Sequence, residues 1–330
     1  MAFPYPARLS LAHLPTPIER MPQLSQQWHG PEIYIKRDDL TGFELSGNKI
    51  RKLEFVIAEA QRQGANYLIT CGGVQSNHAR ATAIAAARLG LSSYLVLRGS
   101  KDEELDGNLL LDYLVGAQIK FISADDYANR VEDIMAELAE DLRRQGHRPY
   151  IIPEGASNEL GAIGYLSATE EIAAQCRQLK VTFDYVVCAV GSGGTHAGLL
   201  LGQKLYHQPY QVIGFNVCDD EAYFVQKISG IMRRAIGQFN LNINFHDSDI
   251  TIIDGYVGAG YALNRQEEIN FIREIARTTG IILDPVYTAK AFYGLKDQII
   301  RGRFQQDDRI LFIHTGGGFG LFPKRKLFLL

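Results

Sequence analysis

The amino-acid sequence predicts an α/β fold built on parallel β-sheet. Short β-rich runs alternate with longer segments of helical periodicity along most of the chain, and this alternation is typical of βαβ units whose strands are buried on both faces. Hydrophobic residues make up 46% of the 330 residues, which is enough for a packed interior. The length suits either one large α/β unit or two lobes with a cleft between them.

The individual elements follow from this alternation in chain order. Predicted strands span residues 32–35, 67–70, 93–97, 119–122, 150–152, 185–190, 211–215, 251–253 and 309–314. Helical periodicity predicts helices at residues 49–63, 78–89, 127–145, 160–179, 195–206, 266–278 and 289–301. No internal repeat or low-complexity linker divides the chain, so any domain boundary must follow from topology.

Four glycine-rich turns follow predicted strands. They are GGVQSN, EGASN, GSGGTHAG and HTGGGFG. Each one alone is typical of a tight strand-to-helix turn. Because open parallel sheets bind ligands at the carboxyl ends of their strands, the four turns together indicate the rim of one site.

Composition narrows the class of function. The formal net charge of −3 gives no electrostatic signature for nucleic acid or an anionic membrane, so we expect a small-molecule substrate. The N-terminus lacks a signal-peptide pattern and no segment is apolar enough to span a membrane, which leads us to expect a cytoplasmic protein. The four cysteines have no CxxC spacing and are expected to be reduced thiols. We assign His78 and His314 to packing or capping and expect no metal site.

The segment SGNKIRKLE places Lys49 in the first turn of a predicted helix. The positive end of the helix dipole and the nearby Arg51 and Lys52 disfavour another cation. We therefore expect a lowered ammonium pKa and a nucleophilic amine at Lys49. The alternative is that all three basic residues lie on a solvated helix face.

The turn GSGGTHAG lies between a predicted strand and a predicted helix. Its backbone N–H groups, the dipole of the following helix and the hydroxyls of Ser192 and Thr195 form a cradle for a phosphate. His196 replaces the third glycine of a dinucleotide-binding motif, and no P-loop lysine follows. The turn therefore predicts phosphate binding without a nucleotide, or else a plain structural turn.

Three further motifs carry polar side chains at strand ends or helix starts. Ser76 and Asn77 in CGGVQSNHAR can offer a hydroxyl and a carboxamide to an anion, although helix capping alone also explains them. Further candidates are Tyr287 and Thr288 in LDPVYTAKA, Thr315 in HTGGGFGLF, and Tyr261. Taken singly, tyrosines are more often packing residues.

In this order, SGNKIRKLE, GGVQSNHAR, IPEGASNELGAIGY, GSGGTHAG, LDPVYT and HTGGGFGLF resemble the family of 1-aminocyclopropane-1-carboxylate deaminase and D-cysteine desulfhydrase. The resemblance implies a fold-type-II, tryptophan-synthase-β-like enzyme with pyridoxal 5′-phosphate in the cleft between two parallel-sheet lobes. By topology the smaller lobe comprises residues 46–164, and the larger comprises residues 1–45 and 165–330. The members of the family are homodimers, and we expect the same here.

The resemblance also implies roles for single residues. Lys49 would hold the cofactor as a Schiff base and exchange protons with the substrate α-carbon. Ser76 would hold the substrate carboxylate, Asn77 would bind the cofactor's phenolic oxygen, and Tyr261 and Tyr287 would lie over cofactor and substrate. The phosphate would bind to four turn residues, Ser192, Gly193, Gly194 and Thr195.

Two positions bear on the substrate. The deaminase branch has a glutamate that pairs with the pyridine nitrogen where this chain has Thr288, and a leucine where it has Thr315. The two threonines resemble the D-cysteine desulfhydrase branch. A neutral hydroxyl makes the ring a weaker electron sink than a carboxylate does, which suits expulsion of thiolate better than opening of a cyclopropane. We therefore expect β-elimination of D-cysteine to pyruvate, hydrogen sulfide and ammonia.

Other functions stay open from the sequence. Within the same chemistry they are 1-aminocyclopropane-1-carboxylate deaminase, L-cysteate sulfo-lyase and related lyases of β-substituted alanines. An arginine or lysine that reaches a sulfonate would favour the sulfo-lyase, and the sequence does not place one. From a different class, the chain could bind pyridoxal phosphate without turnover, because a fold alone does not establish activity.

Overall fold

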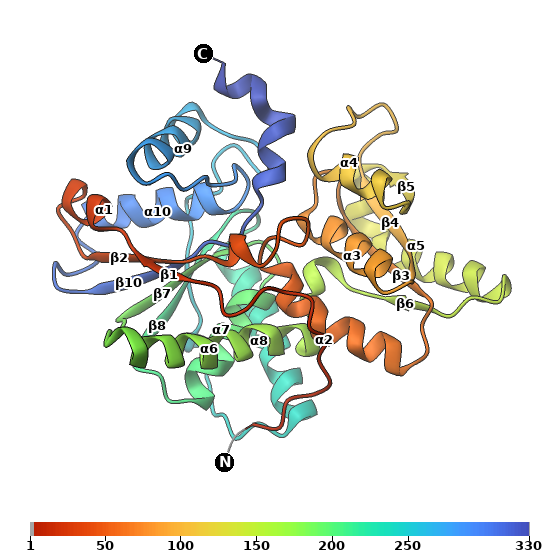
Figure 1. Ribbon diagram of the computed structural model, residues 1–330, viewed down its shortest axis with the longest axis horizontal. Helices are drawn as coiled ribbons and strands as arrows, with labels where there is room; N and C mark the ends of the chain where they lie inside the picture. The colour runs from red at the N-terminus through yellow and green to blue at the C-terminus, as the bar shows by residue number, and fades with distance from the viewer. Residues whose placement is uncertain (1–2, 330) are drawn as a thin grey trace.

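Two β-sheets organise the chain, of which the computed structural model describes residues 3–329. The large sheet has six strands in the order β1-β2-β10-β7-β8-β9, and the small sheet has four in the order β5-β4-β3-β6. Every pair of neighbouring strands is parallel except β1 with β2. In Figure 1 the small sheet and its helices lie to one side of the large sheet. The α/β prediction is confirmed.

The strands are β1 (Ile18–Arg20), β2 (Glu32–Lys36), β3 (Tyr67–Gly73), β4 (Ser92–Arg98), β5 (Gln118–Ile122), β6 (Pro149–Ile151), β7 (Tyr185–Val190), β8 (Gln211–Asn216), β9 (Thr251–Ile253) and β10 (Arg309–Ile313). The α-helices are α1 (Pro22–Gln27), α2 (Lys49–Arg62), α3 (Asn77–Arg88), α4 (Gly107–Leu114), α5 (Ala124–Arg144), α6 (Glu159–Leu179), α7 (Gly194–Leu205), α8 (Glu221–Phe239), α9 (Gln266–Thr279) and α10 (Thr288–Ile300). Short 3-10 helices are η1 (Asp38–Leu40), η2 (Glu154–Ala156), η3 (Asp247–Asp249) and η4 (Gly318–Phe328).

Five strands of the large sheet, β2, β7, β8, β9 and β10, contribute to two hydrophobic cores, because successive side chains point to opposite faces. On β7, Val186 and Cys188 belong to a core shared with α6, α7 and α8. Val187 and Ala189 belong to a second core, shared with α1, α9 and α10. The small sheet is likewise covered by α5 on one face and by α3 and α4 on the other.

Helix α2 joins the two sheets. It precedes the first strand of the small sheet in sequence, yet Leu53, Val56 and Ile57 lie in the core that α6 and β7 share. Its first residue is Lys49. The packing therefore fixes Lys49 relative to the large sheet, while the chain continues from α2 into the small one.

Every strand and helix predicted from the sequence is present, and no end differs from its predicted position by more than three residues. One strand and three α-helices were missed, namely β1, α1, α4 and α8, and none of the four 3-10 helices described was predicted. Two of these are short, and α4 begins at Gly107 and is only 8 residues long. Helix α8 contains Gly230 and Gly237, which lower helix propensity; burial of Phe224, Ile228 and Met232 compensates.

Candidate active site

The glycine-rich turns meet around two adjoining cavities at the carboxyl ends of the strands. An inner cavity is lined by Asn48, Lys49, Asn77, Gly191, Ser192, Gly193, Thr195, His196, Tyr287 and Thr315, besides Ala189 and Val190. An outer cavity of about 270 Å³ is lined by residues of both sheets, among them Ser76, Arg98, Glu154 and Tyr261. Lys49, Ser192 and Tyr287 line both. The turn EGASN also contributes Glu154 and Gly155, so these turns form one rim.

Lys49 lies where the two cavities meet. Its backbone is fixed by the neighbouring Asn48, whose N–H donates to the carbonyl of Thr315 at 3.1 Å. Burial lowers the pKa of the Lys49 ammonium to about 8. The predicted direction is confirmed, and loss of water on burial is the largest cause of the shift. The solvated-face alternative is wrong, since Arg51 and Lys52 are also buried.

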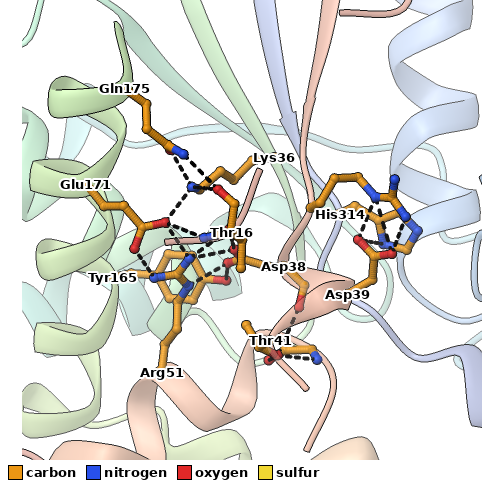
Figure 2. A network of polar contacts seen from close by, with 12 residues as sticks. Thr16, Lys36, Asp38, Asp39, Thr41, Arg51, Tyr165, Glu171, Gln175 and His314 are labelled. Carbon is orange, nitrogen blue, oxygen red and sulfur yellow. Dashed lines mark hydrogen bonds and ion pairs between the residues drawn. The ribbon is translucent and has the colours of Figure 1, made fainter. Parts of the chain in front are cut away.

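Arg51 lies in a network of buried polar groups (Figure 2). Its guanidinium pairs with Asp38 at 2.7 Å and with Glu171 at 2.9 Å. Tyr165 donates its hydroxyl to Asp38 at 2.5 Å, and Thr16 donates to the same carboxylate at 2.7 Å. These partners come from η1, α6 and the N-terminal arm, so the network ties the start of α2 to the large sheet.

Lys52 points toward the glycine turn that precedes α7. Its Nζ donates to Ser157 Oγ at 3.2 Å, and among residues 3–329 no acidic group lies within ion-pair distance of it. Ser157 in turn bonds Ser192 Oγ at 2.7 Å and accepts from the N–H of Gly194 at 3.3 Å. Burial and the nearby Lys49 hold the Lys52 pKa well below its usual value.

This turn has the chemistry of a phosphate site. Gly193 is the N-cap residue before α7 and has a φ of 83°, a conformation that favours glycine and turns the first N–H groups of the helix toward the cavity. Thr195 accepts from Asn48 Nδ2 at 2.9 Å. A buried ammonium without a protein anion beside such a turn is costly unless an anion binds there. The predicted turn residues and Lys52 therefore fit a phosphate.

Ser76 and Asn77 lie at the start of α3. Ser76 Oγ accepts from the N–H of Ala79 at 3.1 Å. Ser76 is therefore a helix cap, which was the alternative to anion binding considered from the sequence. It also lines the outer cavity, together with the end of β3. Asn77 Oδ1 accepts from Asn108 Nδ2 at 3.0 Å, and within the described chain its own Nδ2 has no protein acceptor, which leaves it available to a ligand in the inner cavity.

Two tyrosines form a hydrogen-bonded pair above Lys49. The hydroxyls of Tyr261 and Tyr287 are 2.6 Å apart, and Lys49 Nζ lies 5.7 Å from the centre of the Tyr287 ring. Burial raises the pKa of Tyr261 to about 12 and that of Tyr287 well above its usual value. Both phenols therefore keep their protons at neutral pH.

The two threonines that bear on the substrate lie in different surroundings. Thr315 lines the inner cavity. Thr288 lines neither cavity, because its hydroxyl donates to Asp284 Oδ1 at 2.7 Å and accepts from the Asp284 N–H at 2.8 Å. Among the residues described, the inner cavity is lined by no carboxylate.

Sequence reasoning missed four residues of the site: Lys52, Arg98, Glu154 and Ser157. Lys52 follows Lys49 by three residues and so lies one turn further along α2. Arg98 is the last residue of β4, and Glu154 and Ser157 belong to the EGASN segment. For Arg98, Glu154 and Ser157, the position at or shortly after the carboxyl end of a parallel strand was the signal that could have identified them.

Other observations bear on the remaining expectations. The four cysteines are free thiols. His78 bonds Thr70 Oγ1 at 2.8 Å and His314 accepts from the Gly316 N–H at 3.2 Å. No cluster of His, Cys, Asp and Glu suited to a metal ion occurs between residues 3 and 329. Over the same residues, none of the helices is long and apolar enough to span a bilayer.

Comparison with known proteins agrees with this geometry. A model of the family described as pyridoxal-phosphate dependent enzyme matches residues 9–316. The chain is 47% identical to the mitochondrial bifunctional D-cysteine desulfhydrase/1-aminocyclopropane-1-carboxylate deaminase of Arabidopsis thaliana, over 96% of this chain and 79% of that protein. It is 42% identical to a D-cysteine desulfhydrase of Klebsiella pneumoniae, over 96% and 95% of the two chains. A solved structure of a 1-aminocyclopropane-1-carboxylate deaminase homologue superposes with a TM-score of 0.90 at 40% identity, covering 98% and 96% of the chains.

Proposed function

The chain belongs to the pyridoxal-phosphate dependent enzyme family, and from this premise we propose that it is a D-cysteine desulfhydrase. In the proposed reaction D-cysteine and water give pyruvate, ammonia and hydrogen sulfide. The observation that carries the choice of substrate is the lining of the inner cavity, which has Thr315 and no carboxylate among the described residues. Relatives named for this activity support it.

The residues that would hold the cofactor have matching chemistry. Lys49 offers the amine, and Asn77 Nδ2 offers a hydrogen bond to the ring. The turn from Ser192 to Thr195 offers backbone N–H groups to the phosphate, and the Lys52 ammonium balances its charge. Pyridoxal phosphate in this place supplies an electron sink for the bond that breaks at the substrate α-carbon.

The chain's own groups would perform the proton transfers. With a pKa near 8, the Lys49 amine can accept the α-proton at neutral pH. Ser76 and the N-terminal amides of α3 would bind the substrate carboxylate. The Tyr261 and Tyr287 hydroxyls, which stay protonated, would hydrogen-bond the sulfur and supply a proton as sulfide departs.

The lack of a carboxylate also bears on the competing deaminase activity. A carboxylate at the inner end of the cavity would keep a pyridine nitrogen protonated and strengthen the electron sink. Opening a cyclopropane at an unactivated carbon needs that strength, whereas loss of thiolate from Cβ needs less. The runner-up is 1-aminocyclopropane-1-carboxylate deaminase, which the bifunctional name of the Arabidopsis relative supports.

The identity of the keto acid product distinguishes D-cysteine desulfhydrase activity from 1-aminocyclopropane-1-carboxylate deaminase activity. The purified, cofactor-loaded protein is incubated with D-cysteine, L-cysteine or 1-aminocyclopropane-1-carboxylate, and the keto acid is identified by chromatography. We expect pyruvate and sulfide in equal amounts from D-cysteine and no 2-oxobutyrate from the cyclopropane acid. Production of 2-oxobutyrate alone would reject the argument from the cavity lining.

We further propose a homodimer in the cytoplasm. Apolar side chains are exposed on α4 and η4, including Leu114 and Phe322, which are 70% and 56% exposed. Such surfaces on neighbouring elements suit a subunit contact. Free thiols suit a reducing compartment. Light scattering on the purified protein would give twice the mass of 36.8 kDa for a dimer.

A further inference from the structure

Arg98 presents its guanidinium to the outer cavity. Its guanidinium carbon lies 5.2 Å from the ring centres of both Tyr127 and Tyr261. Between residues 3 and 329, no carboxylate lies within ion-pair distance of it and no acceptor receives a hydrogen bond from it. The two rings hold the cation by their faces, and this leaves the N–H donors of the guanidinium for another group.

Arg98 lies close to the proposed binding site of the substrate. Arg98 pairs with Gly73 in the parallel register of β3 and β4, and its Nη2 lies 3.9 Å from where a Cβ on Gly73 would be. Three residues after Gly73 the chain reaches Ser76, which lines the same cavity as Arg98 and Lys49. The turn from Gly73 to Ser76 therefore carries the proposed site for the substrate carboxylate and lies next to the guanidinium of Arg98.

The other charged groups of the outer cavity differ from Arg98. Lys227 donates to the Tyr223 hydroxyl at 2.9 Å. Glu154 accepts from the Tyr127 hydroxyl at 2.7 Å, and Asp219 also lines the wall. Apart from Lys49, Arg98 is thus the cation of this cavity that has aromatic neighbours and, among the described residues, no hydrogen-bond or ion-pair partner. A planar guanidinium suits a sulfonate or carboxylate in particular.

We propose that Arg98 binds an anionic substituent on the β-carbon of the substrate, so that the enzyme acts on β-substituted alanines with an acidic substituent, of which cysteate is the simplest sulfonate. This proposal rests on the proposed function. D-cysteine bound as its thiolate presents the same charge to Arg98.

The chemistry with cysteate is the same elimination. Lys49 takes the α-proton, the Cβ–S bond breaks, and sulfite leaves with the bonding electron pair. The 2-aminoacrylate that remains takes up water and gives pyruvate and ammonia. Cysteate and one water thus account for pyruvate, ammonia and sulfite, and nothing is oxidised or reduced by an outside reagent.

The turnover test compares substrates that differ in the charge on Cβ. The kcat/KM of each cysteate enantiomer, from sulfite release, is divided by that of β-chloro-D-alanine, from pyruvate release. This ratio is measured for the wild type, Arg98→Met, Arg98→Lys and the matched control Lys227→Met, which removes a different cation from the same wall. We expect Arg98→Met to lower the ratio about 10- to 100-fold, the range for a hydrogen bond to a charged group, Arg98→Lys to lower it less, and Lys227→Met to keep it.

A binding test separates this proposal from the proposed function. Calorimetry with 3-sulfopropanoate, which has the two acidic groups of cysteate but no amine to react, gives Kd for the holoprotein. We expect Arg98→Met to raise Kd at least 10-fold. An unchanged substrate ratio together with an unchanged Kd would overturn the role of Arg98, even if D-cysteine is a substrate. If no substrate turns over but Kd rises in Arg98→Met, the proposed function fails and the anion site stands.

Discussion

Three basic residues in the first turn of α2 have three different surroundings. Lys49 faces the cavities, Arg51 is paired within a buried network, and Lys52 contacts the phosphate turn. The sequence motif identified Lys49 by its resemblance to a family. The sequence pattern alone could not distinguish the surroundings of the three residues. These surroundings depend on which of η1, α6 and the turn before α7 packs against each side of the helix.

The lowered pKa of Lys49 predicts a pH dependence for cofactor uptake. Only the neutral amine attacks an aldehyde, and its fraction rises with pH through the pKa. Uptake of pyridoxal phosphate by the cofactor-free protein should therefore accelerate with pH with a midpoint near 8, as followed by stopped-flow absorbance. A midpoint near 10.5, the ordinary value for lysine, would show that burial does not act as inferred.

Lys52→Met should have opposite effects on binding and on stability. Removal of a buried ammonium without an anionic partner relieves its desolvation cost, so the cofactor-free variant should unfold at higher urea concentration than the wild type. The same change removes a charge-assisted contact to the phosphate, and Kd for the cofactor should rise about 10- to 100-fold. Equilibrium dialysis and urea titration measure the two effects. Unchanged cofactor affinity would place the phosphate elsewhere.

At the scale of elements, helix α2 depends on the network that Figure 2 shows. Arg51→Met would leave Asp38, which is fully buried, without its cationic partner. Breaking such a pair costs about 3–5 kcal/mol of unfolding free energy, and urea unfolding followed by circular dichroism measures it. Arg62→Met on the exposed end of the same helix is the control and should leave the midpoint unchanged. A loss no larger than that of the control would mean that the network does not anchor α2.

Another buried lysine holds the segment that carries Tyr261. Lys290 on α10 donates to the carbonyls of Val257 and Gly260, each at 2.6 Å, and Tyr261 follows directly. We predict that Lys290→Met speeds amide hydrogen exchange of residues 257–264 about 10-fold or more and lowers kcat more than it raises KM. Lys296→Met on the same helix, whose ammonium pairs with Glu274 on α9, is the control. Equal exchange in the two variants would exclude this role.

Hydrophobic periodicity was sufficient to predict helices with a regular apolar stripe, but it was insufficient to predict helices without one. Helix α9 has a clear apolar stripe, with Ile269, Ile272 and Ile275 buried, and was found within one residue. Helix α4 depends on tertiary contacts, since Leu109 packs against Leu95 and Leu97 of the small sheet. The hydrophobic periodicity of a short segment does not show which tertiary contacts that segment will make.

At the scale of the molecule, the two sheets explain why the site assembles from distant segments. The turns after β3, β6, β7 and β10 lie at the carboxyl ends of strands in two different sheets, which is where ligands bind in parallel α/β folds. The rim was therefore predictable from the sequence. The contribution of Arg98 was not, because it depends on which carboxylates the other elements bring near it. Among the described residues, none of those that line its cavity lies within ion-pair distance of it.

The most direct test of the account is the rate of sulfide release from D-cysteine by the wild type and by Lys49→Ala, with circular dichroism to verify that both are folded. We predict steady release of sulfide by the wild type and a decrease in kcat of about 10²- to 10⁴-fold in the variant, the range for loss of a catalytic acid–base group. A wild type that releases no sulfide, or a folded Lys49→Ala variant that releases it at the wild-type rate, would contradict the account.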